Sequence, residues 1–266
     1  MIKVRNLVLM SLLGIITAAA VAQDGIFDEY REMMGEDNAG VFIIDEGQEY
    51  WFSKTGPKAA TLEACDLGLG EGVVEGAYAQ LPRYFEDVDR VMDLEARLVH
   101  CMIDLQGRSR AEVHAKPYSL RGDMGTEIEA LSAWIANQSN GLAIAPGQIH
   151  AREQSAYDVG EKLFYYRAGP HDFSCATCHG QADKRIRLQS LAHLESYDGA
   201  AGAYSSWPAY RISEGIIRTM GWRMRDCFRQ QRMPELVMGS DASVALQIYL
   251  AVNGAGAPLV APGLKR

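Results

Sequence analysis

The feature that most restricts the fold of this chain is a five-residue motif, Cys175-Ala176-Thr177-Cys178-His179. C-x-x-C-H is the attachment signature of c-type haem. Two cysteines about one helical turn apart reach both vinyl groups of one porphyrin, and the adjacent histidine supplies a nitrogen to the iron. A thioredoxin-like pair needs a preceding strand in a βαβ unit, and a zinc site needs two further ligands. We therefore expect one haem c, attached through Cys175 and Cys178, with His179 as an axial ligand.

The segments on both sides of the motif favour helices. Tyr157–Gly169 carries apolar and aromatic residues at helical rather than strand spacing, and Gly169-Pro170 would end that helix. The later segment Ser240–Gly256 starts with a polar cap and continues as a mostly apolar run that ends at Gly254. A helix, the C-x-x-C-H motif, irregular loops and a C-terminal helix are the layout of a small cytochrome c domain.

The first 22 residues have the pattern of a cleaved secretory signal. Lys3 and Arg5 precede an apolar run from Leu7 to Val21, and Ala20-Val21-Ala22 fits the small-x-small rule of signal peptidase. A retained anchor is the alternative, but the apolar core is short for a membrane-spanning helix. We expect cleavage after about Ala22, export of the mature chain and no membrane anchor.

The net charge argues against one class of partner. The formal charge of the chain is −8, and residues 1–22 hold two cations and no acids, so their removal changes it to −10. A chain this acidic is a poor nucleic-acid binder. Any anion site must therefore be built locally by a few residues.

An internal repeat relates the two halves of the chain. Three blocks correspond in the same order: Gly47–Asp66 with Gly160–His179, Arg97–Cys101 with Arg223–Cys227, and Ala130–Gly141 with Ala245–Gly256. We therefore predict a mainly α protein with two cytochrome c-like domains in tandem. These domains would span residues 23–145 and 146–266.

The first copy lacks the residues that attach haem in the second copy. Leu62 stands where the second copy has Cys175, and Asp66 stands where it has His179. The first domain therefore has neither the second thioether cysteine nor the axial histidine, and we expect it to carry no haem.

Two cysteines, Cys65 and Cys101, are left in the first domain without a porphyrin. Exported chains reach an oxidising compartment, in which such cysteines pair. We expect a disulfide between them, which would contribute roughly 2–4 kcal/mol. Pairing of Cys227 with either of these cysteines is the alternative.

Cys227 stands among four arginines, which are Arg223, Arg225, Arg229 and Arg232. Three interpretations are open: a buried free thiol, the sixth ligand of the haem iron, or a reactive thiol. Spacing alone slightly favours Met233 as the sixth ligand. The arginines favour Cys227 instead, because cations stabilise a thiolate and Arg223 lies one helical turn before the cysteine. Arginine grips oxyanions through several donors, so a thiolate beside Arg223 suits a small sulfur oxyanion.

Four segments also carry a family resemblance: GPKAATLEACDLGLGEGVVEGAYAQLPRYFEDVDRVMDLEARLVHCM (Gly56–Met102), SCATCHG (Ser174–Gly180), WPAYRISEG (Trp207–Gly215) and WRMRDCFRQQRMPE (Trp222–Glu235). With these segments the chain resembles the SoxA family, the cytochrome subunits of SoxAX complexes in bacterial sulfur oxidation. The resemblance runs from about Gly47 to Gly256 and so covers nearly all of the mature chain.

The resemblance implies a periplasmic enzyme subunit, an L-cysteine S-thiosulfotransferase. Such a subunit pairs with a small cytochrome, SoxX, and couples thiosulfate oxidatively to a cysteine of the carrier protein SoxYZ, with electrons leaving through haem. Matched position by position, His179 and Cys227 become the axial ligands, Cys227 carries a persulfide, and Arg223 binds the substrate.

The chain departs from many members of the family, which carry two haems. Its first half has no C-x-x-C-H motif, which places it with the single-haem members, in which a disulfide replaces the first haem. The alternative function is a simple periplasmic electron-transfer cytochrome c with Met233 as the axial ligand.

Overall fold

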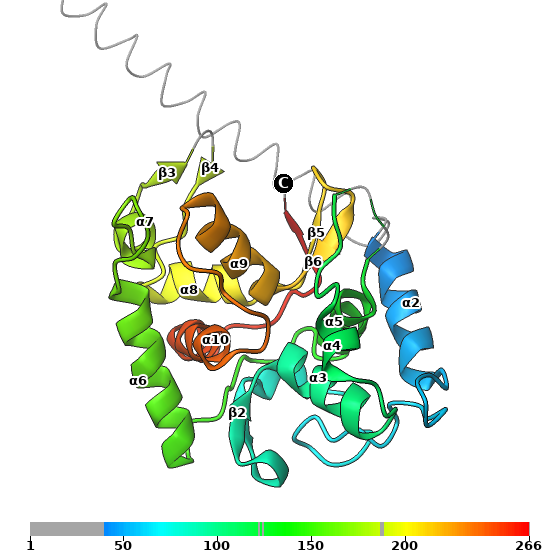
Figure 1. Ribbon diagram of the computed structural model, residues 1–266. Helices are drawn as coiled ribbons and strands as arrows, with labels where there is room; N and C mark the ends of the chain where they lie inside the picture. The colour runs from blue at the N-terminus through cyan, green and yellow to red at the C-terminus, as the bar shows by residue number, and fades with distance from the viewer. Residues whose placement is uncertain (1–39, 122, 124, 187–188, 266) are drawn as a thin grey trace, which may run out of the picture.

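The computed structural model describes residues 40–121, 123, 125–186 and 189–265, and the predicted signal sequence lies outside these residues. The described chain is mainly helical, as the sequence predicts (Figure 1). Its α-helices are α2 (Gly40–Phe52), α3 (Leu94–Asp104), α4 (Arg110–His114), α5 (Glu127–Asn137), α6 (Ala151–Tyr165), α7 (Cys175–His179), α8 (Tyr197–Tyr204), α9 (Met220–Gln230) and α10 (Asp241–Asn253). Short 3-10 turns, η1 (Tyr78–Gln80) and η2 (Glu86–Val88), flank the first strand.

The strands form small ribbons that join loops and do not make a central sheet. Their bounds are β1 (Arg83–Phe85), β2 (Arg90–Met92), β3 (Arg185–Ile186), β4 (Gln189–Ser190), β5 (Ala209–Arg211), β6 (Ile216–Arg218) and β7 (Gly263–Lys265). β1 pairs with β2 and β3 with β4, both antiparallel. β5 lies between β6, which is antiparallel to it, and β7, which is parallel, so the last described strand pairs with β5 and not with β6.

Each half of the chain is built on one close helix crossing, α2 with α5 and α6 with α10 (Figure 1). A Cβ atom on Gly47 of α2 would lie 2.1 Å from the carbonyl oxygen of Ala130, and one on Gly160 of α6 would lie 2.0 Å from that of Ala245. These glycines and alanines are the residues that the sequence repeat aligns. The two crossings therefore use the same contact, in which only glycine fits.

The turn after the first helix of each half also recurs. Gly56 has φ +69° and Gly169 has φ +74°, and each is followed three residues later by a second residue with positive φ, Ala59 (+46°) or Asp172 (+52°). Each turn is closed by an isolated antiparallel bridge, Thr55 with Ala60 in the first half and Ala168 with Phe173 in the second. The left-handed conformation explains the glycine of both Gly-Pro pairs, because glycine adopts positive φ without strain.

Helix caps decide where the helices begin. The predicted Ser240 cap of α10 forms, because the Ser240 side chain accepts a hydrogen bond from the backbone N–H of Ser243. α6 begins six residues earlier than the Tyr157 start of the predicted segment. His150 caps its N-terminus, and the Glu153 carboxylate accepts hydrogen bonds from the backbone N–H groups of Ile149 and His150.

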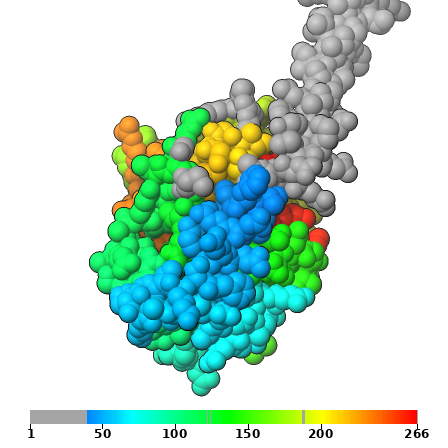
Figure 2. Space-filling model, turned by 90° about the vertical axis from the view of Figure 1, so that its right-hand side faces the viewer, coloured from blue at the N-terminus to red at the C-terminus, as the bar shows by residue number. Residues whose placement is uncertain are grey.

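The two halves share one apolar core and a buried ion pair. Arg218, on β6 of the second half, donates from Nη1 to Glu129 Oε1 at 2.8 Å, and their side chains are 2% and 0% exposed. The same nitrogen also donates to the carbonyl and hydroxyl oxygens of Ser119, both at 2.8 Å. Figure 2 shows the face of the molecule that α2 and the residues after it cover. Within the described ranges, no helix is both long and apolar enough to cross a membrane.

Candidate haem and sulfur site

The C-x-x-C-H motif forms the short helix α7. Ser174 and Thr177 make a capping box: the Ser174 N–H donates to Thr177 Oγ1 at 3.0 Å, and the Thr177 N–H donates to Ser174 Oγ at 3.2 Å. This box fixes one helical turn, which holds Cys175 and Cys178 at the spacing that two thioether bonds to one porphyrin require. Both cysteines are free thiols in the structure and are partly buried.

His179 is oriented for metal binding. Its Nδ1 lies 2.8 Å from the carbonyl oxygen of Ala192, and since a carbonyl only accepts, Nδ1 carries the proton. Nε2 is therefore left with a lone pair. Burial lowers the pKa of His179 and so favours the neutral imidazole. The hydrogen bond to Ala192 opposes this shift, and the nearby Arg223 adds to it. A neutral histidine with a carbonyl-bound Nδ1–H is the usual form of a metal-ligating histidine, so the residues present fit a haem iron.

Helix α9 brings Cys227 to the same place. Thr219 caps this helix by accepting from the backbone N–H of Trp222 at 3.1 Å. Cys227 interacts electrostatically with Cys178, and Cys175 interacts with Cys227, so the three free thiols form one group. The structure thus brings Cys227 together with the haem motif, although Cys175 and Cys227 are 52 positions apart in the sequence.

Burial and the nearby cations have opposite effects on the pKa of the Cys227 thiol. Burial raises the pKa of the Cys227 thiol, and Arg223 opposes this effect. Asp226 raises the pKa further, while Arg211 lowers it. Two guanidinium groups therefore favour the thiolate in a site where desolvation disfavours it, and the thiolate is the form that binds iron and reacts with sulfur compounds.

The four arginines around Cys227 differ in their roles. Arg223 is 25% exposed and donates to Asp226 Oδ2 at 3.2 Å, whereas Arg229 is 71% exposed and binds the other oxygen of the same carboxylate at 2.7 Å. Arg225 pairs with Glu235 at 3.1 Å. Arg232 is exposed and has φ +55° in the turn after α9. Arg223 acts electrostatically on the Cys227 thiol and lowers its pKa.

Arg211 is a site residue that the sequence analysis missed. It lies on β5, its Nε is buried without a hydrogen-bond partner, and the nearest carboxylate oxygen, on Glu214, is 3.7 Å away. Burial and the neighbouring Arg223 lower the pKa of its guanidinium. The only sequence signal was its place in WPAYRISEG, because nothing in the spacing links a strand residue to α9. Arg211 and Arg223 together form a pair of cations beside Cys227.

The first half contains the counterpart of this site without its chemistry. Cys65 and Cys101 form a disulfide with a Cα–Cα distance of 5.7 Å, so Cys227 pairs with neither of them in the structure. Arg97, which aligns with Arg223, donates to the Asp66 carbonyl oxygen at 2.6 Å and to Asp87 Oδ2 at 2.7 Å. Both Nε and Nη1 of Arg97 thus bind protein oxygens, in a cavity of about 800 Å³ that the disulfide lines.

Met233, the competing axial ligand, is partly buried in the turn after α9. Its backbone N–H donates to the Phe228 carbonyl oxygen at 2.9 Å. A Cβ atom on Gly169 would lie 3.2 Å from Met233 Cα, so the methionine packs behind the Gly169-Pro170 turn that precedes the motif. Met233 is therefore held by its backbone on the turn, whereas Cys227 interacts with the motif cysteines through its sulfur.

Comparisons with known proteins agree on one family. The family model described as "SoxA/TsdA, cytochrome c domain" matches residues 46–144, the half that has no C-x-x-C-H motif. The crystal structure of SoxXA from P. pantotrophus superposes with a TM-score of 0.72 at 22% identity, covering 90% of this chain and 84% of the other, which shows a shared fold.

Two relatives carry the same name, L-cysteine S-thiosulfotransferase subunit SoxA. The protein from Hydrogenobacter thermophilus is 32% identical over 85% of this chain and 82% of its own length. The protein from Hydrogenophilus thermoluteolus is 47% identical over 239 residues, which are 90% of this chain and 87% of the relative. At this level of identity and coverage, the chain belongs to the SoxA family.

Proposed function

We propose that this chain is the SoxA subunit of a periplasmic L-cysteine S-thiosulfotransferase. It would couple thiosulfate oxidatively to a cysteine of a SoxYZ-like carrier protein and pass the electrons to a SoxX-like partner cytochrome. The observation that carries the proposal is the meeting of Cys227, Arg223 and Arg211 with the C-x-x-C-H helix in one partly buried site. The names of the relatives support the same reaction.

One haem c would be held by Cys175 and Cys178 through thioether bonds, with His179 and Cys227 as axial ligands. The His179 Nδ1–H bond to the Ala192 carbonyl oxygen supports this assignment, because it leaves the Nε2 lone pair available to a metal. When bound, the haem supplies a redox centre that takes up electrons. A persulfide on Cys227 is part of the proposal and rests on the family resemblance alone.

Arg223 and Arg211 would bind thiosulfate, which is a dianion at neutral pH. Two guanidinium groups near one thiol supply the donors for the sulfonate oxygens, and their burial strengthens each hydrogen bond because water competes less. Asp226 holds Arg223 at 3.2 Å and so fixes its direction. The sulfane sulfur of thiosulfate would then lie beside the sulfur of Cys227.

The overall reaction is an oxidative coupling. A bond forms between the sulfane sulfur of thiosulfate and the sulfur of the carrier cysteine, which reacts as a thiolate. No bond to the sulfonate group breaks, so the product is a cysteine S-thiosulfonate and two electrons are released. The partner cytochrome is the oxidant that accepts them. A plain electron carrier would need no oxyanion clamp beside its iron ligand, which is why the transferase is favoured over the alternative with Met233.

The organisation of the chain follows from the same proposal. Residues 1–22 would be the export signal, residues 23–145 a haem-less cytochrome c-like domain, and residues 146–266 the haem domain. The equivalent crossings at Gly47 and Gly160 support this division. The disulfide between Cys65 and Cys101 suits an oxidising compartment such as the periplasm.

The test is thiosulfate coupling to a SoxYZ-like carrier by the haem-loaded complex with its partner cytochrome. Cys227→Ala should abolish transfer, while Met233→Leu, the matched test of the alternative ligand, should leave turnover and the haem spectrum unchanged. Intact mass should show one haem and one disulfide, with one further sulfur atom on Cys227. Full turnover by Cys227→Ala, or a methionine–iron charge-transfer band that Met233→Leu removes, would refute the proposal.

A further inference from the structure

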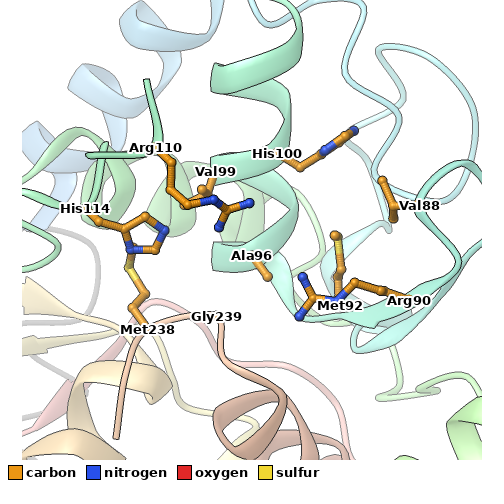
Figure 3. A pocket seen from close by; sticks show the side chains of 10 residues that line it. All are labelled: Val88, Arg90, Met92, Ala96, Val99, His100, Arg110, His114, Met238 and Gly239. Atoms are coloured by element: carbon orange, nitrogen blue, oxygen red, sulfur yellow. The ribbon is translucent and has the colours of Figure 1, made fainter. Parts of the chain in front are cut away.

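A second pocket lies at the junction of the two halves, away from the sulfur site. It has a volume of about 180 Å³. Helices α3 and α4, strand β2 and the loop before α10 form its walls (Figure 3). It is lined by Val88, Arg90, Met92, Ala96, Val99, His100, Arg110, His114, Met238 and Gly239. None of these residues belongs to the group around Cys227, so the pocket is a separate feature.

The charge of the lining has one sign. Its polar side chains are Arg90, His100, Arg110 and His114, the remaining residues are apolar or glycine, and no carboxylate lines the pocket. In Figure 3 the guanidinium groups of Arg90 and Arg110 extend from opposite sides toward the space in front of Ala96. The chain has a formal charge of −8, so a pocket whose charged side chains are arginines differs in sign from the chain as a whole.

Two of these groups lack a partner within the described part of the chain. The exposed side chain of Arg110 makes no hydrogen bond or ion pair with any described residue. The Nε2 atom of His114 is buried and has no hydrogen-bond partner. Arg90 is paired with Asp241 at 2.5 Å, but the Asp241 side chain is 89% exposed and stands outside the lining. An unpartnered buried nitrogen costs about 1–3 kcal/mol, which a bound ligand can recover.

The pKa values of both histidines are lowered, which favours their neutral forms when no anion is bound. Burial lowers the pKa of His114, and Arg110 lowers it further. Burial also lowers the pKa of His100, with Arg97 and Arg110 acting in the same direction and Asp87 and Asp104 opposing them. His100 Nε2 lies 3.6 Å from Asp87 Oδ2, so this carboxylate is its nearest counter-charge.

We propose that this pocket binds a small tetrahedral oxyanion of the sulfate class, held by Arg110 and Arg90 with hydrogen bonds from His114 and His100. A water in the liquid occupies about 30 Å³, so 180 Å³ holds one such anion with a few waters but no folded peptide segment. The apolar floor formed by Met92, Val99 and Met238 keeps the local dielectric low and strengthens the contacts. All four polar groups belong to the first half, and the second half contributes only Met238 and Gly239 to the wall.

The pH dependence of binding follows from the histidines. An anion favours their charged forms, so binding must raise the pKa of His114 and His100 and take up protons. Affinity for sulfate should therefore increase as the pH falls below about 6.5, the value of an ordinary histidine, through their lowered pKa values. Sulfate and phosphate share the required shape and charge, and thiosulfate does so through its sulfonate group.

The experiment uses the haem-loaded protein in complex with its partner cytochrome, with Cε1-¹³C-labelled histidine. Histidine signals are followed by NMR against pH, at constant ionic strength, in chloride and then with sulfate, phosphate or thiosulfate added. We expect saturable shifts and raised pKa values for His114 and His100. The exposed His150 and His171 are internal controls, and their pKa values should not change when the anions are added. Because this readout is local to the pocket, it reports independently of thiosulfate turnover.

Two matched substitutions complete the test. Arg110→Gln should weaken sulfate binding on the order of tenfold, which is about 1.4 kcal/mol. Arg121→Gln removes the same charge from an exposed residue outside the pocket and should leave binding unchanged. The proposal is overturned if the histidine signals drift without saturating, if both variants lose affinity equally, or if thiosulfate binds and sulfate does not.

Discussion

A Cβ atom on Gly160 would lie 2.0 Å from the carbonyl oxygen of Ala245, so helices α6 and α10 meet backbone against backbone. The same hypothetical atom would lie 2.8 Å from Tyr249 Cβ. Real Cβ atoms do not approach so closely, and the atoms in the way belong to a helix backbone that cannot rotate aside. The contact is therefore closed to any other residue unless α6 moves relative to α10.

Replacement of Gly160 by alanine should destabilise the haem half. The added methyl group forces α6 away from α10, a change that typically costs about 1–3 kcal/mol despite the better helix propensity of alanine. Gly202→Ala is the matched control, because Gly202 is also helical and its Cβ would meet nothing within 4 Å. The free energy of unfolding of the holoprotein, measured with guanidinium, should fall for Gly160→Ala alone. Equal stability of both variants would contradict the close crossing.

The disulfide should stabilise the first half. Cys65 and Cys101 are 36 residues apart, and a loop of this length corresponds to about 3–4 kcal/mol of unfolded-state entropy. The double variant Cys65→Ala/Cys101→Ala should therefore unfold at lower denaturant concentration while its haem absorbance stays unchanged. The single variant Cys101→Ala should lose at least as much stability, because it also leaves Cys65 as a buried free thiol. A loss of haem from the double variant would show that the halves are not separable in this way.

The internal repeat of the two halves could be detected in the sequence, because close packing restricts which residues can stand at certain positions. Gly47 and Gly160 are fixed by helix crossings, and Gly56 and Gly169 by positive φ, so alignment of these positions predicted a shared architecture. The cap at Ser240 was visible for a similar reason, since side-chain capping depends only on neighbours in sequence.

Contacts between segments far apart in the chain could not be predicted from the sequence. Arg211, on β5, acts on Cys227 and Arg223 of α9, and no local sequence pattern encodes that approach. The buried pair of Arg218 and Glu129 joins residues 89 positions apart, and neither charge signals its own burial. The early start of α6 escaped prediction because histidine is a rare cap, and Glu153 completes the cap only in the folded turn.

The two arginines beside Cys227 should control use of thiosulfate. Arg223→Gln and Arg211→Gln each remove a charged donor, and a hydrogen bond to a charged group contributes about 1.5–3 kcal/mol, so KM for thiosulfate should rise about tenfold to hundredfold. Arg229→Gln is the control, because Arg229 also binds Asp226 but is 71% exposed, and it should change KM little. Steady-state kinetics with the partner cytochrome and carrier separates these cases. If all three variants behaved alike, net charge and not the pair would govern binding.

The buried carboxyl group of Glu95 should make stability depend on pH in an unusual direction. Glu95 Oε2 accepts a hydrogen bond from the Tyr118 hydroxyl at 3.1 Å and lies against Gly221 at the start of α9, where a Cβ atom would be 2.1 Å from it. Burial raises the pKa of Glu95 to about 8, and Asp93, whose own pKa is raised by burial to about 6, contributes to the shift. The folded protein therefore keeps a proton on Glu95 at neutral pH.

From about pH 4.5 to 8 the unfolded chain releases this proton while the folded protein retains it. The contribution of Glu95 to the free energy of unfolding should therefore fall as the pH rises, by up to about 1.4 kcal/mol per pH unit. Glu95→Gln keeps the shape and cannot ionise, so its stability relative to the parent should increase across this window. Glu161→Gln, on the exposed surface of α6, should show no such trend. Denaturation curves of the parent, Glu95→Gln and Glu161→Gln, at pH values from about 5 to 8, measure the free energy of unfolding of each. If this free energy depended on pH in the same way in all three proteins, Glu95 would be ionised in the folded state.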